Sequence, residues 1–149
     1  MNTDRQIDVQ MEVKDKKWSS FHRSALTVKA EWSEMIMKRR KTIELAAHHL
    51  RKLDILKGGT IIVPLMTDSH IIGLIEIQDS FQISSEADFL RLSDFHCWSG
   101  KYDECVWQYA WRIVDVYPLT PIHVHRRSGS QRWVRIEQWE SKVLEQLYN

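Results

Sequence analysis

Two clusters of basic side chains are candidate phosphate-binding groups. Residues 38–41 read Lys-Arg-Arg-Lys, and a second stretch brings Arg126, Arg127, Arg132 and Arg135 together without an intervening acid. Clustered cations of this kind bind a phosphate backbone by displacing its counterions. The alternative interpretation is a solvated surface balanced by acids elsewhere. The net charge is only +1, from 21 basic and 20 acidic residues, so any attraction to nucleic acid must come from such local clusters.

A lysine and a glutamate stand three residues apart at Lys41 and Glu44. Lys41 could bind a phosphate, or act as a general base if burial lowered its pKa, and Glu44 could accept a hydrogen bond from a base amino group. A structural ion pair is the alternative. Because a carboxylate close to an ammonium favours the charged form, we expect Lys41 to stay protonated and to bind anions.

Aromatic side chains are a second candidate ligand surface, since the chain has seven tryptophans. Tyr109 and Trp111 alternate and would share one face of a strand, and Trp32 stands close to the first basic cluster. Stacking on a base contributes about 1–3 kcal/mol in single-strand recognition. Packing in a hydrophobic core is the alternative for each of them.

Metal, cofactor and nucleophile motifs are weak or absent. The histidine pairs at 48–49 and at 123 and 125 have no cysteine or acid at a matching spacing, and the two cysteines lack a CxxC context. The sequence has no Walker A loop, no dinucleotide-binding glycine fingerprint and no Gly-x-Ser-x-Gly elbow. We therefore expect no metal and no cofactor.

The composition is that of a soluble globular domain, with 43% hydrophobic and 28% charged residues over 149 positions. The first residues are polar and lack the apolar core of a signal peptide, and no apolar run approaches the roughly 20 residues of a membrane span. We expect a cytoplasmic protein with no membrane contact. The oligomeric state stays open.

The elements that must position these side chains follow from hydrophobic periodicity and turn residues. An alternation of short β-rich runs with few helices predicts a small mixed β-barrel of the α+β class, with a helix after the first strand and a helix at the end of the chain. Gly73 indicates a bulge or a close backbone approach, Ser85 begins a capping box, and Pro118 should end a long strand. Strands are predicted at 24–29, 41–46, 60–65, 71–78, 106–117, 122–127 and 132–137, with the last two joined as a hairpin at 128–130.

The order of these segments resembles the opening of the ASCH domain, a family with a PUA-like barrel. The resemblance begins with the strand at 25–29, the segment 32–36 that starts at a tryptophan, and 41–44, which matches part of the motif Gly-x-Lys-x-x-Glu-x-Arg. Later segments at 73–77, 109–111, 117–119 and 132–135 follow in the same order. The resemblance implies an N-terminal extension over 1–24, an ASCH/PUA-like domain over 25–136, and a C-terminal helix over 137–149 packed on the domain.

Two positions depart from the family motif. Arg39 stands where the motif has its glycine, so we expect a different turn between helix and strand. Ala46 stands where it has its arginine, which removes a guanidinium that could hold a phosphate or carboxylate.

The resemblance implies an RNA-binding or modified-base-binding module. A basic rim would hold the backbone, and a cleft around Lys41 and Glu44 would hold an extruded base or nucleoside. Some relatives are similar in fold to an amidohydrolase of acetylated cytidine, in which case Lys41 would be the catalytic group, although Glu44 stands where that enzyme has a threonine. A protein-interaction module without a functional pocket is the third hypothesis. The candidate nucleic-acid or ligand-binding residues are Lys29, Trp32, Ser33, Lys38, Arg39, Arg40, Lys41, Glu44, Tyr109, Trp111, Arg126, Arg127 and Arg132.

Overall fold

The structure is a computed structural model that describes residues 22–55, 59–105, 108–125, 132–136 and 139–148. The strands are β1 (Ser24–Thr27), β2 (Ile43–Ala46), β3 (Ile61–Thr67), β4 (His70–Gln82), β5 (Tyr109–His123) and β6 (Trp133–Arg135). The helices are α2 (Ala30–Met37), α3 (Lys52–Ile55), α4 (Glu86–Arg91), α5 (Ser93–His96) and α6 (Glu140–Tyr148), with a 3₁₀ turn η2 (Tyr102–Glu104).

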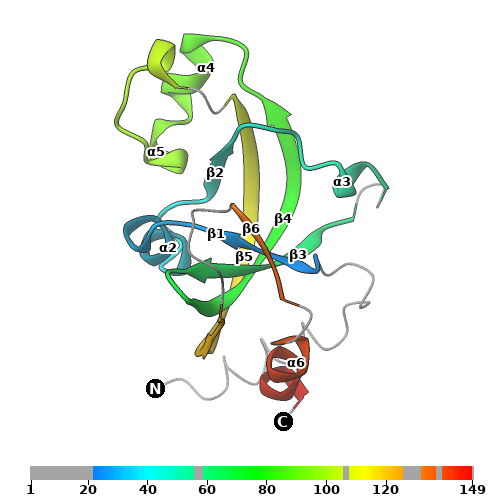
Figure 1. Ribbon diagram of the computed structural model, residues 1–149. Coiled ribbons are helices and arrows are strands. Elements are labelled where there is room, and N and C mark those ends of the chain that lie inside the picture. The colour runs from blue at the N-terminus through cyan, green and yellow to red at the C-terminus, as the bar shows by residue number, and fades with distance from the viewer. Residues whose placement is uncertain (1–21, 56–58, 106–107, 126–131, 137–138, 149) are drawn as a thin grey trace.

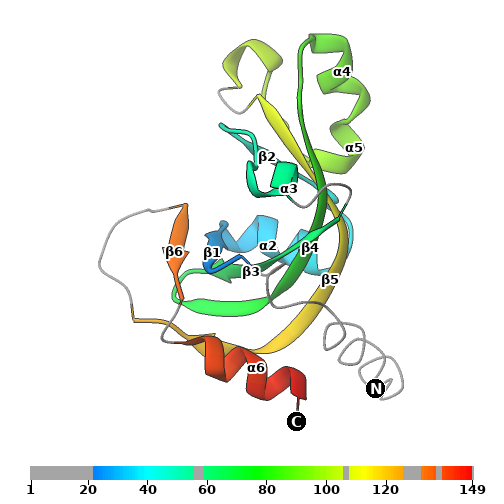
Figure 2. The ribbon, with the colours of Figure 1, turned by 90° about the vertical axis from the view of Figure 1, so that its right-hand side faces the viewer.

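The six strands form one mixed sheet in the order β2-β5-β4-β3-β1-β6. Among these strands, β1 and β3 run parallel and the other neighbours are antiparallel. The long strands β4 and β5 curve through the whole molecule, with α4 and α5 at one end and α6 at the other (Figures 1 and 2). This confirms the predicted α+β class, with the predicted barrel present as a mixed, half-closed sheet.

Two of the three hydrophobic clusters among the described residues lie on the two sides of the sheet, because successive strand side chains point to opposite faces. On β4, Leu74 belongs to a core that includes Val143 and Leu147 of α6. The next residue, Ile75, belongs to a second core that includes Ile36 of α2 and receives Trp111. The helix after the first strand and the C-terminal helix therefore each cover one side of the sheet.

Gly73 marks both a bulge and a close backbone approach, as the sequence predicts. The β4–β5 register shifts between Ile71 and Gly73. A Cβ atom at Gly73 would lie 2.6 Å from Met37 Cε and 2.9 Å from the carbonyl oxygen of Tyr117. The side chain of Met37 can move, but the backbone of Tyr117 cannot move without distorting β5.

We expect Gly73→Ala to lower the free energy of unfolding by about 1–3 kcal/mol, the usual cost of overpacking. Urea denaturation of the variant against the wild type measures this decrease. In a Met37→Ala background, Gly73→Ala should lower the free energy of unfolding by a smaller amount. The decrease should not vanish, because the clash with the Tyr117 carbonyl persists. An unchanged denaturation midpoint in Gly73→Ala would contradict the close approach.

The expectation that Pro118 ends its strand is wrong, since β5 continues to His123. The reason is that β2 pairs only with Tyr109–Arg112, which leaves the rest of that edge of β5 without a strand neighbour among the described residues. Thr120 directs its N–H and C=O toward this edge, where the Gln146 amide bonds to both. Pro118 alternates with Thr120, so its missing N–H faces the same edge and costs no hydrogen bond between strands.

The predicted C-terminal hairpin is also wrong. β6 pairs antiparallel with β1, with Ala25 opposite Val134, and lies at the far edge of the sheet from β5. The serine-glycine segment at 128–130 lies outside the described residues. The chain after β5 therefore returns to the first strand instead of folding back on β5 (Figure 2).

The turn after α2 keeps a backbone conformation typical of glycine, contrary to the expectation from Arg39. Arg39 has φ 63°, in the left-handed region that disfavours residues with a Cβ. Its guanidinium lies 2.6 Å from the carboxylate of Asp115 and donates to the carbonyl of Val116 at 3.3 Å. These two contacts with β5 offset the local backbone cost.

Candidate functional site

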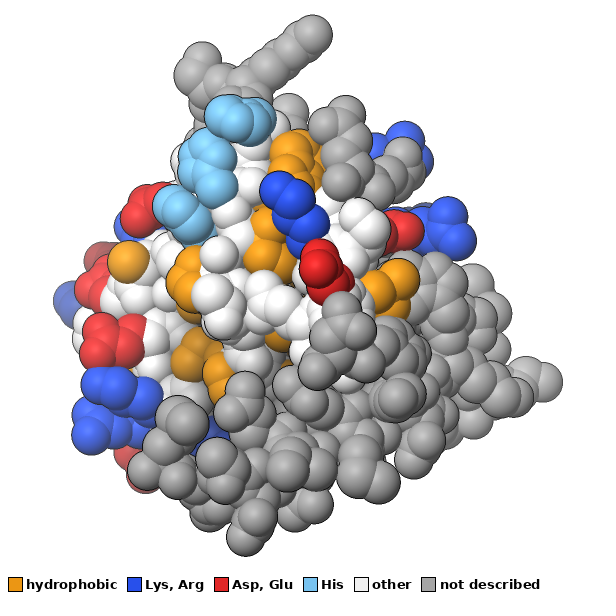
Figure 3. All heavy atoms as spheres, turned by 90° about the horizontal axis from the view of Figure 1, so that it is seen from below, with side chains coloured by type: hydrophobic (Ala, Val, Ile, Leu, Met, Phe, Trp, Pro, Cys, Tyr) orange, Lys and Arg blue, Asp and Glu red, His pale blue; other side chains and the backbone are white. Residues whose placement is uncertain are grey.

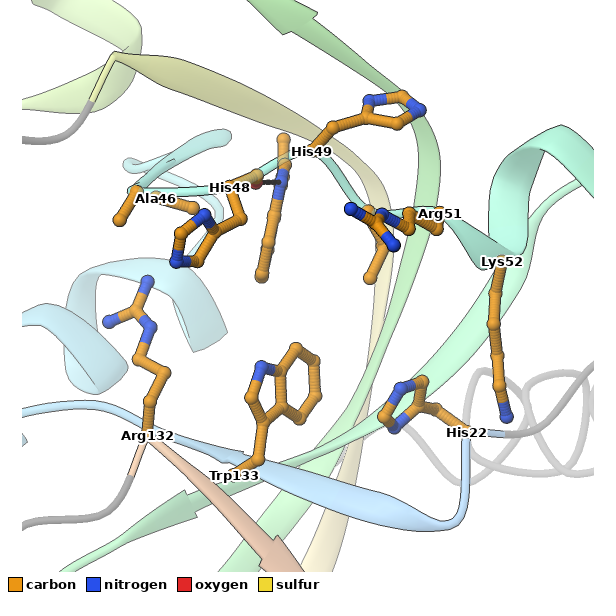
Figure 4. A pocket seen from close by; sticks show the side chains of 11 residues that line it. His22, Ala46, His48, His49, Arg51, Lys52, Arg132 and Trp133 are labelled. Atoms are coloured by element: carbon orange, nitrogen blue, oxygen red, sulfur yellow. Dashed lines mark hydrogen bonds between the residues drawn. The ribbon is translucent and has the colours of Figure 1, made fainter.

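A pocket of about 510 Å³ opens beside the edge of the sheet formed by β1 and β6, below the segment that connects β2 to α3 (Figure 4). We call it the tryptophan pocket. Its walls come from four places that are distant in sequence: His22 before β1, residues 46–52, Trp111 of β5, and residues 132–133 where β6 begins. The residues that line it are His22, Ala46, Ala47, His48, His49, Leu50, Arg51, Lys52, Trp111, Arg132 and Trp133.

Aromatic rings form one wall of the tryptophan pocket. The ring centroids of Trp111 and Trp133 lie 5.7 Å apart with planes tilted by 34°, and the His22 ring lies 4.3 Å from that of Trp133. The Trp111 indole N–H donates to the carbonyl of His48 at 3.1 Å, which ties β5 to the opposite wall. A flat apolar surface of this kind suits a planar ring.

The segment of residues 48–52 is held by polar contacts with β4. The Ser80 hydroxyl oxygen accepts from the backbone N–H of Leu50 at 3.1 Å and lies 2.9 Å from His49 Nδ1. These contacts fix the loop that carries Arg51 and Lys52, both exposed, at the start of α3. Arg51 and Lys52, which form the cationic rim on this side of the pocket, therefore belong to a loop that is anchored to β4.

Arg132 forms the opposite cationic wall, immediately before β6. The β1–β6 pairing sets its place, because Trp133 lies opposite Leu26. Its Nη2 donates to the carbonyl of Leu45 at 2.9 Å and lies 3.8 Å from Glu44 Oε2. The side chain is 38% exposed, so part of the guanidinium faces the pocket.

Lys41 and Glu44 lie behind this wall, inside the protein. Lys41 Nζ donates to the carbonyls of Ile43 at 2.8 Å and His96 at 2.5 Å, and lies 3.5 Å from Glu44 Oε1. Its ammonium also lies 5.4 Å from the centre of a Trp32 ring. Three oxygen acceptors around one nitrogen match the three N–H donors of a protonated lysine. Neither Lys41 nor Glu44 lines the tryptophan pocket.

Burial dominates the electrostatics of Lys41. Desolvation lowers the pKa of its ammonium, and the charge of Glu44 opposes that shift without outweighing it. The expectation from sequence rested on the carboxylate of Glu44 and left burial out, because the burial of Lys41 is not visible in the sequence. Within the described part of the chain, Glu44 Oε2 is buried without a hydrogen-bond partner and has only the longer contact with Arg132. The carboxylate thus links the buried lysine to the arginine of the pocket.

Two histidines near the site are held toward their neutral forms. Burial lowers the pKa of His22, against a hydrogen bond with the Ser24 carbonyl, and the charge of Lys52 lowers it further. Burial also lowers the pKa of His96, whose Nδ1 accepts from the N–H of Trp98. His96 Nε2 lies 3.0 Å from the Phe89 carbonyl oxygen. The tautomer with its proton on Nε2 can donate to this carbonyl while Nδ1 accepts from Trp98.

The other predicted site residues are scattered over the molecule. Lys38 pairs with Glu34 on the exposed side of α2, and Arg39 pairs with Asp115. Lys29 and Arg40 are exposed, whereas Ser33 is buried and donates to the Ala30 carbonyl. Tyr109 is half-buried beside His49, with ring centroids 6.2 Å apart. Arg126 and Arg127 lie outside the described residues.

Several lining residues of the pocket were missed by sequence reasoning, above all Trp133 with the loop cations Arg51 and Lys52. Two signals could have identified them. The run at 48–52 combines two histidines, an arginine and a lysine directly after a strand, and Arg132 is followed at once by a tryptophan. Their convergence depends on the pairing of β6 with β1, which local sequence does not reveal.

Histidine side chains also gather outside the pocket. The rings of His70 and His123 lie 5.1 Å apart and those of His123 and His125 lie 4.6 Å apart. Figure 3 shows histidine side chains in a row on the face seen from below. Within the described ranges, no group of three or more histidines, cysteines, aspartates or glutamates is arranged to hold a metal ion. No helix in the same ranges is long and apolar enough to cross a membrane.

Comparison with known proteins identifies the fold. No protein-family model matches the sequence, and no curated protein matches it in sequence. The structure is similar to the crystal structure of ASCH from Zymomonas mobilis, with a TM-score of 0.62, 14% identity, and coverage of 82% of this chain and 92% of that one. A serine-to-alanine mutant of that protein gives a TM-score of 0.63 at 16% identity, over 83% and 94% of the two chains. The chain therefore has the fold of these ASCH proteins, a small α+β fold.

Proposed function

We propose that this chain binds single-stranded nucleic acid, with RNA as the first candidate, through the tryptophan pocket. One observation carries the proposal: the pocket combines two indoles with three cationic side chains and three imidazoles, and none of the described residues that line it is acidic. Cations select an anionic ligand, and indoles favour a planar ring beside it. A nucleotide unit of a nucleic acid strand has both properties.

The size and charge of the pocket favour this ligand over other small molecules. A volume of about 510 Å³ falls within the range of sites that enclose a ligand of drug size. The cationic rim would repel a methylated ammonium group, the other ligand that aromatic walls commonly take. Because the net charge of the chain is only +1, this concentration of positive groups is a local feature.

The buried Lys41–Glu44 pair has a supporting role in this proposal. Glu44 lies between the Lys41 ammonium and the Arg132 guanidinium, at 3.5 and 3.8 Å. We assign it the task of holding Arg132 against the pocket wall. The basic rim expected from Lys38, Arg39, Arg40, Arg126 and Arg127 stays a prediction. Lys38 and Arg39 are paired with Glu34 and Asp115, and Arg126 and Arg127 lie outside the described residues.

The two other hypotheses have less support. A hydrolase with Lys41 as its active group needs an amine that a substrate can reach, whereas Lys41 does not line the tryptophan pocket and its Nζ donates to two backbone carbonyls. A protein-interaction module needs no aromatic pocket with a cationic rim. We therefore expect no conversion of acetylated cytidine to cytidine by the purified chain, measured by chromatography.

The proposal predicts salt-sensitive binding of a fluorescein-labelled single-stranded RNA. Replacing Arg51 and Lys52 together by glutamine should weaken binding and reduce the magnitude of the log–log salt slope by about 0.7 for each phosphate that is no longer bound. Fluorescence anisotropy at several salt concentrations measures both. Charge reversal at Arg126 and Arg127 tests the extended rim in the same way.

The matched control is Arg91→Gln, because Arg91 is an exposed arginine that does not line the tryptophan pocket. This variant should keep the wild-type affinity and slope. An Arg51 and Lys52 double variant that binds RNA as tightly as the wild type, with the same slope, would contradict the proposal. Equal decreases in the Arg91 control would mean that binding depends on net charge and not on the pocket.

A further inference from the structure

The cations of the tryptophan pocket lie on two opposite sides of its aromatic wall. In Figure 4, Arg132 lies on one side of Trp133 and Lys52 lies on the other. Arg132 comes from the start of β6, whereas Lys52 begins α3. The positive charge is thus divided between two walls and does not form one patch.

The two cationic sides differ in chemistry. Arg132 presents a planar guanidinium, one nitrogen of which is bound to the Leu45 carbonyl at 2.9 Å. A guanidinium has five N–H donors in a fixed fork, so others stay directed away from Leu45 and suit a phosphate. Arg51 and Lys52 lie on exposed positions of the anchored loop, where Lys52 offers a compact point charge. Each side can hold one phosphate group.

This division matches the covalent structure of an internal nucleotide. A nucleoside inside a strand carries a phosphate on both its 5′ and its 3′ oxygen, on opposite sides of its base and sugar. A free mononucleotide, or a strand end with a free terminal hydroxyl, carries phosphate on one of these oxygens only and would leave one cationic wall without an anion.

We infer that the tryptophan pocket takes an internal nucleotide of a single strand, with its base against Trp133 and its two flanking phosphates on the two cationic walls. The inference rests on the proposed function and adds the position of the bound unit within the strand. One phosphate is bound by Arg132 and the other by Lys52 with Arg51. The strand therefore passes across the pocket and does not end in it.

The test uses four forms of one nucleoside as probes: adenosine, its 5′-monophosphate, its 3′-monophosphate and its 3′,5′-bisphosphate. Each is titrated into the full chain, and tryptophan fluorescence or calorimetry gives the affinity. We expect the bisphosphate to bind at least about tenfold more tightly than either monophosphate, as an added charge-assisted contact of about 1.5–3 kcal/mol implies. The cytidine series repeats the measurement with a different base.

Variants then assign each phosphate to a wall. Arg132→Gln should abolish the increase in affinity from one phosphate and leave the increase from the other, and replacing Arg51 and Lys52 together by glutamine should show the reverse pattern. Arg132→Lys keeps the charge and should recover part of the affinity, which separates a weaker phosphate interaction from a failure to fold. Arg91→Gln serves as the control with an unchanged pattern.

Two results would overturn the inference. In the first, the bisphosphate binds no more tightly than the better monophosphate, which would mean that the pocket holds only one phosphate. In the second, the variants of the two walls abolish the increase in affinity from the same phosphate, which would mean the same. If long RNA still binds through the pocket in that case, the proposed function stands and the internal position is wrong. If neither RNA nor any of the nucleotides binds, both fail.

Discussion

Replacing Glu44 by alanine is expected to lower the free energy of unfolding by about 3–5 kcal/mol, the usual cost of breaking a buried ion pair. The Glu44 side chain is 6% exposed, and its carboxylate lies between Lys41 and Arg132. Its removal leaves the buried Lys41 ammonium with two carbonyl acceptors and no counter-charge. Urea denaturation, followed by circular dichroism, measures the decrease.

A double-mutant cycle separates the pair from its surroundings. Lys41→Met alone should also destabilise the chain, whereas Lys41→Met with Glu44→Leu should cost less than the sum of the single changes, because both buried charges leave together. The matched control is the exposed pair of Lys38 and Glu34, which lies at 2.7 Å with both side chains more than half exposed. Glu34→Ala should leave the denaturation midpoint unchanged. Additive effects of the two buried substitutions would contradict the coupling.

The pH dependence of stability supplies an independent check on Lys41. Its pKa is lowered by burial from 10.5, so the unfolded chain keeps this proton at pH values where the folded chain releases it. Stability then rises with pH through the window between the folded-state pKa and 10.5, since the unfolded state binds more protons there. Relative to Lys41→Met, the wild type should become more stable as the pH increases through that window. If the free energies of unfolding of the wild type and Lys41→Met differ by the same amount at every pH, the pKa of Lys41 is the same in the folded and the unfolded chain.

Much of the architecture could be predicted because it depends on local patterns. The helix after the first strand, the capping box at Ser85, where the side chain accepts from the N–H of Asp88 at 3.1 Å, and the bulge at Gly73 all follow from residues close together in sequence. The pairing of β6 with β1 could not be predicted this way. More than 100 residues separate these strands, and the hydrophobic alternation of a three-residue strand fits several partners.

The same difference between local and long-range contacts explains which parts of the site could be predicted from the sequence. An ion pair of Lys41 with Glu44 was one interpretation that the sequence allowed, since three residues separate them, but its burial depends on packing from α5 and β6. Ala46 implied the loss of a guanidinium, yet the structure brings the Arg132 guanidinium to the Leu45 carbonyl from the other end of the sheet. The sequence indicated Trp133 only as part of a closing segment. Its place beside Trp111 follows from the long-range pairing and not from either sequence neighbourhood.

Replacing Trp133 by leucine is expected to weaken single-stranded RNA binding by about 1–3 kcal/mol, or roughly 5- to 150-fold in the dissociation constant. Trp133 is half-buried and lies between the two cationic walls (Figure 4). Leucine keeps apolar volume but offers no flat ring for a base. Anisotropy titrations of the variant and the wild type at one salt concentration measure the change.

Two further variants identify stacking as the cause. Trp133→Phe keeps a planar ring and should recover much of the affinity, whereas Trp139→Leu should keep the wild-type affinity because Trp139 packs against the core near α6 and does not line the pocket. The salt slope should stay the same in all three, since none of them removes a charge. If Trp133→Leu changes the slope but not the affinity at low salt, the ring acts by positioning Arg132, its neighbour in sequence, and not by contact with the base. A decrease in Trp139→Leu equal to that in Trp133→Leu would trace the effect to stability, because only one of these two indoles can touch a ligand in the tryptophan pocket.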